Sequence, residues 1–121
     1  MAKYVDGFVL AVPKKNVDKY RGIARKAGKI WREYGALEYR ECVAEDVPKG
    51  KVTSFPLSVQ AKRNETVIFA WITYKSRAHR DRVNKQVMED PRVVAEMERP
   101  ESTPFDASRM IYGGFEVIVD A

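Results

Sequence analysis

Apolar side chains fill both alternating faces of the segment 65–75, ETVIFAWITYK. One face carries Val67, Phe69 and Trp71. The other face carries Ile68, Ala70 and Ile72. The run is short and rich in β-branched and aromatic residues, which favours a strand over a helix. Because a strand with two apolar faces is covered on both sides, this segment predicts a central strand of a sheet.

The segments 4–12 and 37–45 predict two further strands of different kinds. In 4–12 both faces are apolar apart from Asp6, so we expect a second central strand that ends at Pro13. In 37–45 only one side is apolar, and Glu41 interrupts that side. Such a half-exposed pattern is typical of a strand at the edge of a sheet.

A long helix is predicted over 17–34, because apolar residues recur there at three- and four-residue spacing. Its apolar face consists of Val17, Tyr20, Ile23, Ala24, Ala27, Ile30, Trp31 and Tyr34. Asn16 is placed to cap the N-terminus of this helix. Gly35 is placed to end it in a left-handed conformation.

Two shorter helices are predicted in the second half of the chain. Ser76 is placed to cap a helix over 77–89. Asp90 followed by Pro91 is the typical start of another helix, which we expect over 91–98.

The remaining stretches are two connections and a last strand. The connection 46–64 is long, and Ser54 could cap a short turn of helix within it. We expect a loop over 100–108 and a strand over 109–120. Gly113-Gly114 in that strand indicates a bulge or a close approach to the backbone.

The predicted order is strand, helix, strand, strand, helix, strand. With right-handed crossovers this order gives an α+β, ferredoxin-like βαββαβ fold with a four-stranded antiparallel sheet. The first and third strands then lie in the centre, as their apolar faces require. The helices cover only one face of such a sheet, so we expect a second copy of the chain to cover the other, in a C2 homodimer.

Size and composition indicate one soluble globular domain, residues 1–121. The chain has 121 residues, of which 45% are hydrophobic and 32% charged. No run approaches the roughly 20 apolar residues that a membrane-spanning helix needs. The single Cys42 excludes an internal disulfide and fits a reducing compartment, so we expect a cytoplasmic protein with no membrane partner.

Positive charge is concentrated on the first helix. The net charge of the chain is +5, and the segment 14–32 holds eight Lys and Arg residues against one acid, Asp18. Four of these cations repeat at helical spacing opposite the apolar face: Arg21, Arg25, Lys29 and Arg32. Such a face could bind RNA or an acidic protein partner. A solvated helix face is the simpler interpretation, and nucleic acid is disfavoured because no aromatic residue interleaves there.

Three segments together resemble a known family: TSFP (53–56), ETVIFAWITYKSRAHRDRVN (65–84) and PFDASRMIYGGFEVIV (104–119). They are similar to the YbaA-like family of small bacterial proteins, and the resemblance covers nearly the whole chain. It implies a ferredoxin-like fold in the dimeric α/β-barrel superfamily, which includes cofactor-free monooxygenases, isomerase-like proteins and stress-response binding proteins. The family has no established reaction, so no catalytic residue carries over from it.

His79 is the one histidine and the one candidate catalytic residue. It lies in SRAHRD at the start of a predicted helix. In a pocket it could act as a general base, with neighbouring arginines favouring its neutral form. The alternative is a surface or capping histidine. Arg77 beside it could bind a carboxylate of a ligand, although pairing with Asp81 is the more usual role.

The other candidate ligand-binding residues lie on or near strands. Asp106, Arg109 and Tyr112 cluster at the last strand, where Asp106 could instead cap a turn and pair with Arg109. Trp71 lies on a central strand, where large aromatic residues are more often core or interface than ligand cage. In the superfamily that the chain resembles, however, an aromatic-lined cavity between sheet and helices binds apolar small molecules.

Standard cofactor motifs are missing from the sequence. One His and one Cys cannot build a standard zinc site. The chain has no phosphate loop, dinucleotide fingerprint or serine elbow. We therefore expect no metal and no cofactor.

Two functions of different classes follow. The first is a homodimeric barrel that binds a small apolar or aromatic metabolite between sheet and helices, with cofactor-independent oxygenase or isomerase-type activity as its enzymatic extension. The alternative is a non-catalytic interaction protein, whose basic helix binds RNA or an acidic protein.

Overall fold

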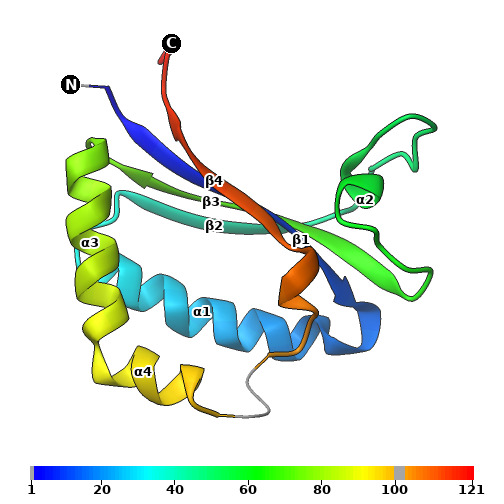
Figure 1. Cartoon of the computed structure of the whole chain (residues 1–121), viewed down its shortest axis with the longest axis horizontal. Coiled ribbons are helices and arrows are strands. Elements are labelled where there is room, and N and C mark those ends of the chain that lie inside the picture. The colour runs from blue at the N-terminus through cyan, green and yellow to red at the C-terminus, as the bar shows by residue number, and fades with distance from the viewer. Residues whose placement is uncertain (1, 100–102) are drawn as a thin grey trace.

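The fold is a four-stranded antiparallel sheet with its three longer helices packed on one face. This computed structural model describes residues 2–99 and 103–121. The strand order is β2-β3-β1-β4, and all neighbouring strands are antiparallel. In Figure 1, α1, α3 and α4 lie below the sheet and α2 lies on its other side. The strands are β1 (Tyr4–Pro13), β2 (Glu38–Val43), β3 (Glu65–Tyr74) and β4 (Ile111–Glu116).

The two strands with two apolar faces occupy the centre, as predicted. β1 pairs with β3 over its whole length, from Tyr4 opposite Tyr74 to Pro13 opposite Glu65. The half-exposed strand β2 lies at an edge. The predicted ferredoxin-like α+β topology is therefore confirmed.

The long helix α1 (Val17–Glu33) follows a 3-10 turn (Lys14–Asn16). Gly35 has a φ of 112°, which confirms the predicted left-handed end of the helix. Asn16 occupies the predicted N-cap position of α1, but its side chain makes no capping hydrogen bond. Instead, its Nδ2 donates to the carbonyl of Pro104 at 2.9 Å and ties the start of α1 to the segment before β4.

Three shorter helices follow the predicted capping signals. They are α2 (Phe55–Ser58), α3 (Arg77–Glu89) and α4 (Pro91–Met97). The Ser54 hydroxyl accepts from the Leu57 amide at 3.1 Å. Asp90 accepts from the Arg92 amide at 2.8 Å, so it caps α4 while also ending α3. Of the predicted loop 100–108, residues 100–102 lie outside the described residues.

Replacing Ser76 by alanine should lower the free energy of unfolding by about 1 kcal/mol, the usual cost of losing an N-cap. The Ser76 hydroxyl accepts from the His79 amide at 3.1 Å, and the serine is buried. Urea denaturation measures the loss. Replacement by aspartate, which can also cap, is the control and should retain most of the stability; an equal loss in both variants would contradict a capping role.

The last strand is shorter than predicted, since β4 covers only part of 109–120. Within the described residues β4 pairs with β1 alone, from Ile111 opposite Val9 to Glu116 opposite Tyr4, and a last backbone hydrogen bond joins the Val117 amide to the Lys3 carbonyl at 3.0 Å. The pairing register runs through Gly113 and Gly114 without an inserted residue, so there is no bulge. The predicted close approach is present instead: a Cβ on Gly114 would overlap the side chains of Arg80 and Tyr4.

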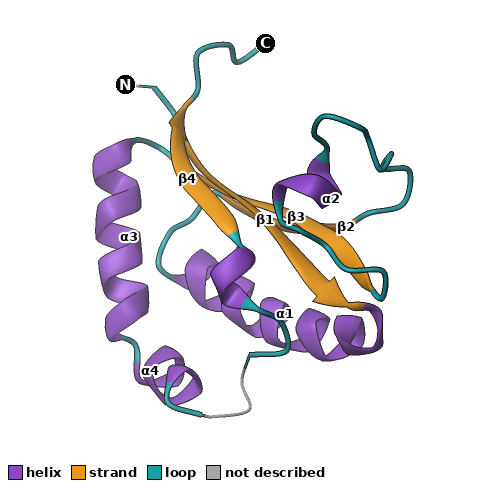
Figure 2. Ribbon diagram, turned by 45° about the vertical axis from the view of Figure 1, so that its right-hand side comes forward, coloured by secondary structure: helices purple, strands orange, loops and turns teal. Residues whose placement is uncertain are grey.

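The two faces of the sheet are covered differently. Toward the helices, the fully buried side chains include Leu10, Val12, Tyr74, Val83 and Val87. On the opposite face, Val59 of the α2 segment packs on Val9, Ala11 and Val67. The rest of that face is uncovered: Phe69 is 43% exposed and Phe115 63% exposed. Figure 2 shows α2 over one end only of this face.

Within the described residues, no helix is both long and apolar enough to cross a bilayer.

Candidate ligand-binding cavity

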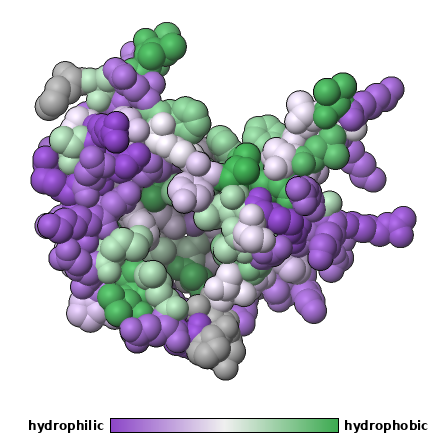
Figure 3. All heavy atoms as spheres, in the orientation of Figure 1, coloured by the Kyte–Doolittle hydropathy of each residue, from purple (hydrophilic) through white to green (hydrophobic). Residues whose placement is uncertain are grey.

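A cavity of about 410 Å³ lies between the sheet and the helices. Its walls come from β1, β2, β3 and β4 on one side and from α1 and α3 on the other. Figure 3 shows the side of the molecule seen in Figure 1, and a hollow is visible near its centre. The apolar part of the wall consists of Phe8, Leu10, Ala27, Trp31, Ala70, Ile72, Met88, Phe105 and Met110.

One end of the cavity holds a buried ion pair. Asp6 on β1 is 8% exposed, and its Oδ1 accepts from Arg80 Nε on α3 at 3.1 Å. The Arg80 guanidinium also lies over the ring of Tyr4, 4.9 Å from its centre, and donates to the Tyr4 hydroxyl at 3.3 Å. Gly114 leaves the room for this contact, because a Cβ there would overlap both side chains.

Burial raises the pKa of Asp6 above its ordinary value, while Arg80 and the side chains of Asn84 and Tyr74 oppose that rise. The carboxyl group is therefore protonated at a higher pH than an ordinary aspartate. A carboxyl in that condition can exchange a proton with a bound molecule more readily than an ordinary aspartate.

Asn84 has a fixed orientation at the same end of the cavity. Its Oδ1 accepts from Trp31 Nε1 and from the Tyr74 hydroxyl, each at 3.1 Å. Because the oxygen is held by two donors, the amide nitrogen is left to donate toward Asp6. This network connects α1, β3 and α3 around the buried carboxyl group.

The other end of the cavity is closed by two tyrosines on one carboxylate. Glu41 on β2 accepts hydrogen bonds from the hydroxyls of Tyr20 and Tyr39, the latter at 2.6 Å. Burial, and then the Glu41 charge, raise the pKa of both tyrosines. The three side chains also line a second groove on the far side, so they form a partition between two hollows.

Asp6 and Glu41 were not among the site residues predicted from the sequence, yet the sequence contains their signal. Each is the polar exception on an otherwise apolar strand face. A buried charge is costly unless it is paired, so such an exception is more informative than a polar residue in a loop.

His79 lies outside this cavity. It borders a separate hollow of about 360 Å³ with Tyr34 and Arg82. Its Nδ1 accepts from the Lys75 amide at 3.0 Å, and its ring meets Tyr74 edge-on. Burial, then Lys75 and Arg82, lower the pKa of His79, in the predicted direction. The geometry favours the capping alternative over catalysis.

Tyr112 is the one predicted site residue that lines the cavity. It is 72% exposed and stacks on Phe8 with ring centres 6.3 Å apart, so it lies at the rim. Trp71 faces the opposite side of the sheet, where it packs against Phe69 at 5.7 Å. Arg77 is exposed, and its nearest described carboxylate is that of Asp81 at 4.0 Å.

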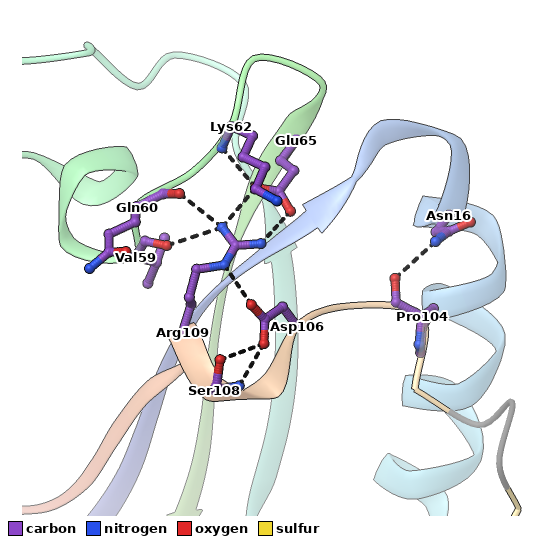
Figure 4. Close-up of polar contacts among 9 residues, drawn as sticks. All are labelled: Asn16, Val59, Gln60, Lys62, Glu65, Pro104, Asp106, Ser108 and Arg109. Carbon is purple, nitrogen blue, oxygen red and sulfur yellow. Dashed lines mark hydrogen bonds and ion pairs between the residues drawn. The ribbon is translucent and has the colours of Figure 1, made fainter.

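Arg109 and Asp106 lie side by side, as predicted, but their hydrogen bonds and ion pairs hold two segments of the chain together (Figure 4). The Arg109 guanidinium makes a two-pronged pair with Glu65, at 2.7 and 2.8 Å, and donates to Asp106 at 2.9 Å and to the Gln60 carbonyl at 2.8 Å. Asp106 also caps the 3-10 turn (Ala107–Arg109) through the Ser108 amide. Hydrogen bonds from Ser108 and Arg109 lower the pKa of Asp106 to about 2. These groups are occupied in joining the α2 connection to the start of β4.

With the fold and cavity described, comparison with known proteins is direct. A family model described as "Protein of unknown function (DUF1428)" matches residues 3–107. The chain belongs to this family.

Relatives and a similar solved structure agree with that placement. The uncharacterized protein YbaA of Escherichia coli K12 is 54% identical over 118 residues, covering 98% of each chain. The same identity and coverage hold for YbaA of Shigella flexneri. A crystal structure of a dimeric ferredoxin-like protein from an uncultured marine organism covers 100% of both chains with a TM-score of 0.63 and 13% identity. That similarity supports the ferredoxin-like fold.

The described residues include no group of three or more His, Cys, Asp or Glu side chains that could hold a metal ion. Cys42 is exposed on β2. The chemistry that the cavity itself offers is that of the Asp6–Arg80 pair and the two tyrosine hydroxyls, around an apolar interior.

Proposed function

We propose that this protein binds a small apolar or aromatic metabolite in the cavity between the sheet and the helices. The observation that carries the proposal is the cavity itself, which combines an apolar wall with a few convergent polar groups. That combination is the usual composition of a small-molecule site. Its volume of about 410 Å³ lies within the range of known ligand sites.

The polar ends indicate where a ligand's own polar group would lie. Arg80 offers a positive charge, although Asp6 already neutralises much of it. A ligand with an apolar body and one hydrogen-bonding group fits this arrangement better than a polyanion. Cofactor-independent oxygenase or isomerase-type chemistry would need a group that moves a proton, and Asp6, with its raised pKa, is our candidate.

We also propose a homodimer formed through the uncovered face of the sheet. The exposed apolar side chains on that face, Phe69, Ile111 and Phe115, lie on β3 and β4, and exposed apolar patches of this kind mark interfaces. The similar marine protein is a dimeric ferredoxin-like protein, which supports a dimeric state for this chain. The proposed dimer leaves the cavity on the opposite side of the sheet. We retain the cytoplasm as the expected location.

Filling the cavity should abolish ligand binding. Replacing Ala27, which lines it, by phenylalanine should weaken binding of the apolar dye 8-anilinonaphthalene-1-sulfonate at least tenfold, because the ring occupies the ligand's space. Dye titration measures this, and native mass spectrometry of the purified wild type should show a retained small mass. Exposed Ala78 on α3 changed to phenylalanine is the matched control. Equal dye binding by both variants, together with no retained mass, would contradict the cavity's role.

The basic residues of α1 favour a second candidate function, recognition of RNA or an acidic protein partner. The favouring observation is a groove beside α1 that four of these residues line, namely Arg21, Arg25, Lys29 and Arg32. Tyr20 and Tyr39 also line this groove, although no aromatic residue interleaves among the four cations on the helix itself. Folding of β2 alongside α1 brings Tyr39 there.

A further inference from the structure

A groove of about 730 Å³ runs between α1 and the edge strand β2. Figure 1 shows α1 extending alongside β2 beneath the sheet. The groove is lined on the helix by Val17, Tyr20, Arg21, Ala24, Arg25, Gly28, Lys29 and Arg32, and on the strand by Leu37, Glu38, Tyr39, Arg40, Glu41 and Val43. These residues include one whole side of the helix and nearly all of the strand.

The outer edge of β2 presents backbone groups to this groove, and among them the Tyr39 carbonyl accepts only a long hydrogen bond, from Arg40 Nη1 at 3.4 Å. The Ala44 amide donates to the Val67 carbonyl at 2.9 Å, which fixes the alternation of the β2–β3 ladder. In an antiparallel pair every second residue bonds its neighbour and the others point away. The backbone groups of Tyr39, Glu41 and Val43 therefore face the open edge, where a further strand can pair.

The groove is strongly positive. Arg21, Arg25, Lys29, Arg32 and Arg40 line it, against the carboxylates Glu38 and Glu41. Arg21 is held by Asp18 at 2.5 Å, and Arg32 donates to the carbonyls of Ala36 and Leu37, between α1 and β2. Within the described part of the chain, neither Arg25 nor Lys29 has a carboxylate within 4.0 Å, and both are exposed.

The dimensions suit an extended peptide. At 1.5 Å per helical residue and about 3.3 Å per strand residue, both walls are roughly 20 Å long. A strand of about six residues spans that length. Alternate side chains of such a strand would point toward α1, where the cations lie, and the intervening ones toward the opposite face of the sheet.

We propose that this groove binds an acidic, extended segment of a partner protein, which adds to β2 as a fifth strand and directs its carboxylates toward Arg25 and Lys29. This inference deepens the second candidate function and does not depend on the cavity. It favours a peptide over RNA, because the open edge of β2 offers backbone groups with which a further strand can pair. The Tyr39 ring also packs on Gly28, whose added Cβ would lie 2.6 Å from it, so that face cannot stack on a base.

A fluorescently labelled six-residue peptide of alternating glutamate and valine is the probe, with the lysine–valine peptide as its charge control. We expect the acidic peptide to bind and the basic one not to. Reversing Arg25 and Lys29 together to glutamate should weaken binding at least tenfold. Reversing Arg82 and Lys85 on α3, which are also exposed, is the matched control and should leave it unchanged. Circular dichroism checks that each variant folds.

A peptide N-methylated at alternate residues separates strand pairing from charge attraction, because it keeps the charges but cannot donate to the edge. Of the two possible methylation frames, one should weaken binding at least tenfold. If both methylated peptides still bind in a charge-dependent way, the second candidate function stands, but the proposal that the peptide pairs with β2 as a fifth strand is contradicted. Absence of acidic-peptide binding, tighter binding of single-stranded polyuridylate, or edge-to-edge self-association in sedimentation would also overturn the proposal.

Discussion

Replacing Arg80 by methionine should lower the free energy of unfolding by about 3 kcal/mol at pH 7, the low end of the cost of removing one partner from a buried ion pair. Asp6 would remain buried without its cation, in a wall of the cavity. Arg80 itself keeps 22% of its side chain exposed, which places the expected cost at the low end. Urea denaturation measures the loss, with exposed Arg82 changed to methionine on the same helix as the control.

The stability deficit of the Arg80→Met variant, that is, its loss in free energy of unfolding relative to the wild type, should become smaller as the pH falls. The pKa of Asp6 is already raised by burial, and Arg80 is the leading influence that lowers it, so its removal raises that pKa further. A carboxyl with a raised folded-state pKa contributes stability that is present below its unfolded pKa, ordinarily 3.8, and is lost as pH rises through the folded value. The deficit should therefore shrink as the pH falls from 7 toward 4.

A second substitution tests the same explanation. Changing Asp6 to asparagine in the Arg80→Met background removes the charge that was left unpaired, so the double variant should recover much of the stability at pH 7. A deficit that is the same at pH 7 and pH 4, with no recovery in the double variant, would contradict this account of the pair.

Replacing Phe69 by glutamate should convert the proposed dimer into monomers. Phe69 lies on the uncovered sheet face between Phe55 and Trp71, with ring centres 5.8 and 5.7 Å away. In a C2 interface the change appears twice, and each buried carboxylate lacks a partner. The dimer dissociation constant should rise at least a hundredfold, which sedimentation velocity over a concentration series measures.

The control for the dimer prediction is Met97→Glu, an equally drastic change at an exposed apolar residue on α4. It should leave the association state unchanged. Wild-type protein that is monomeric throughout the concentration series, or a Phe69→Glu protein that stays dimeric, would contradict the proposed interface. The intrinsic fluorescence of Trp71, observed in a Trp31→Phe background, reports locally on the same face.

Local patterns were sufficient to predict most elements. The spacing of apolar residues in 17–34 predicted α1, and Ser54, Ser76 and Asp90 cap the helices expected after them. The errors have local physical reasons. β4 is shorter than its apolar run because β1 ends beside it. Asn16 donates to Pro104, 88 residues away, and that partner could not be read from neighbouring positions.

The candidate site was harder to predict, because chemistry-bearing residue types were weighed without knowing which strand face they share. His79, Arg77, Arg109 and Asp106 are reactive or charged, but local capping and ion pairs occupy them. Trp71 alternates onto the face away from the cavity.

By itself the sequence determined the order of strands and helices, because apolar periodicity and capping residues act between near neighbours. It also determined which strands are central and where positive charge gathers. Only the tertiary structure decided that Asp6 meets Arg80, that Tyr20 and Tyr39 share Glu41, and that α1 forms a basic groove with the edge of β2. Those contacts join residues far apart in the chain, so they exist only once strand register and helix packing bring them together.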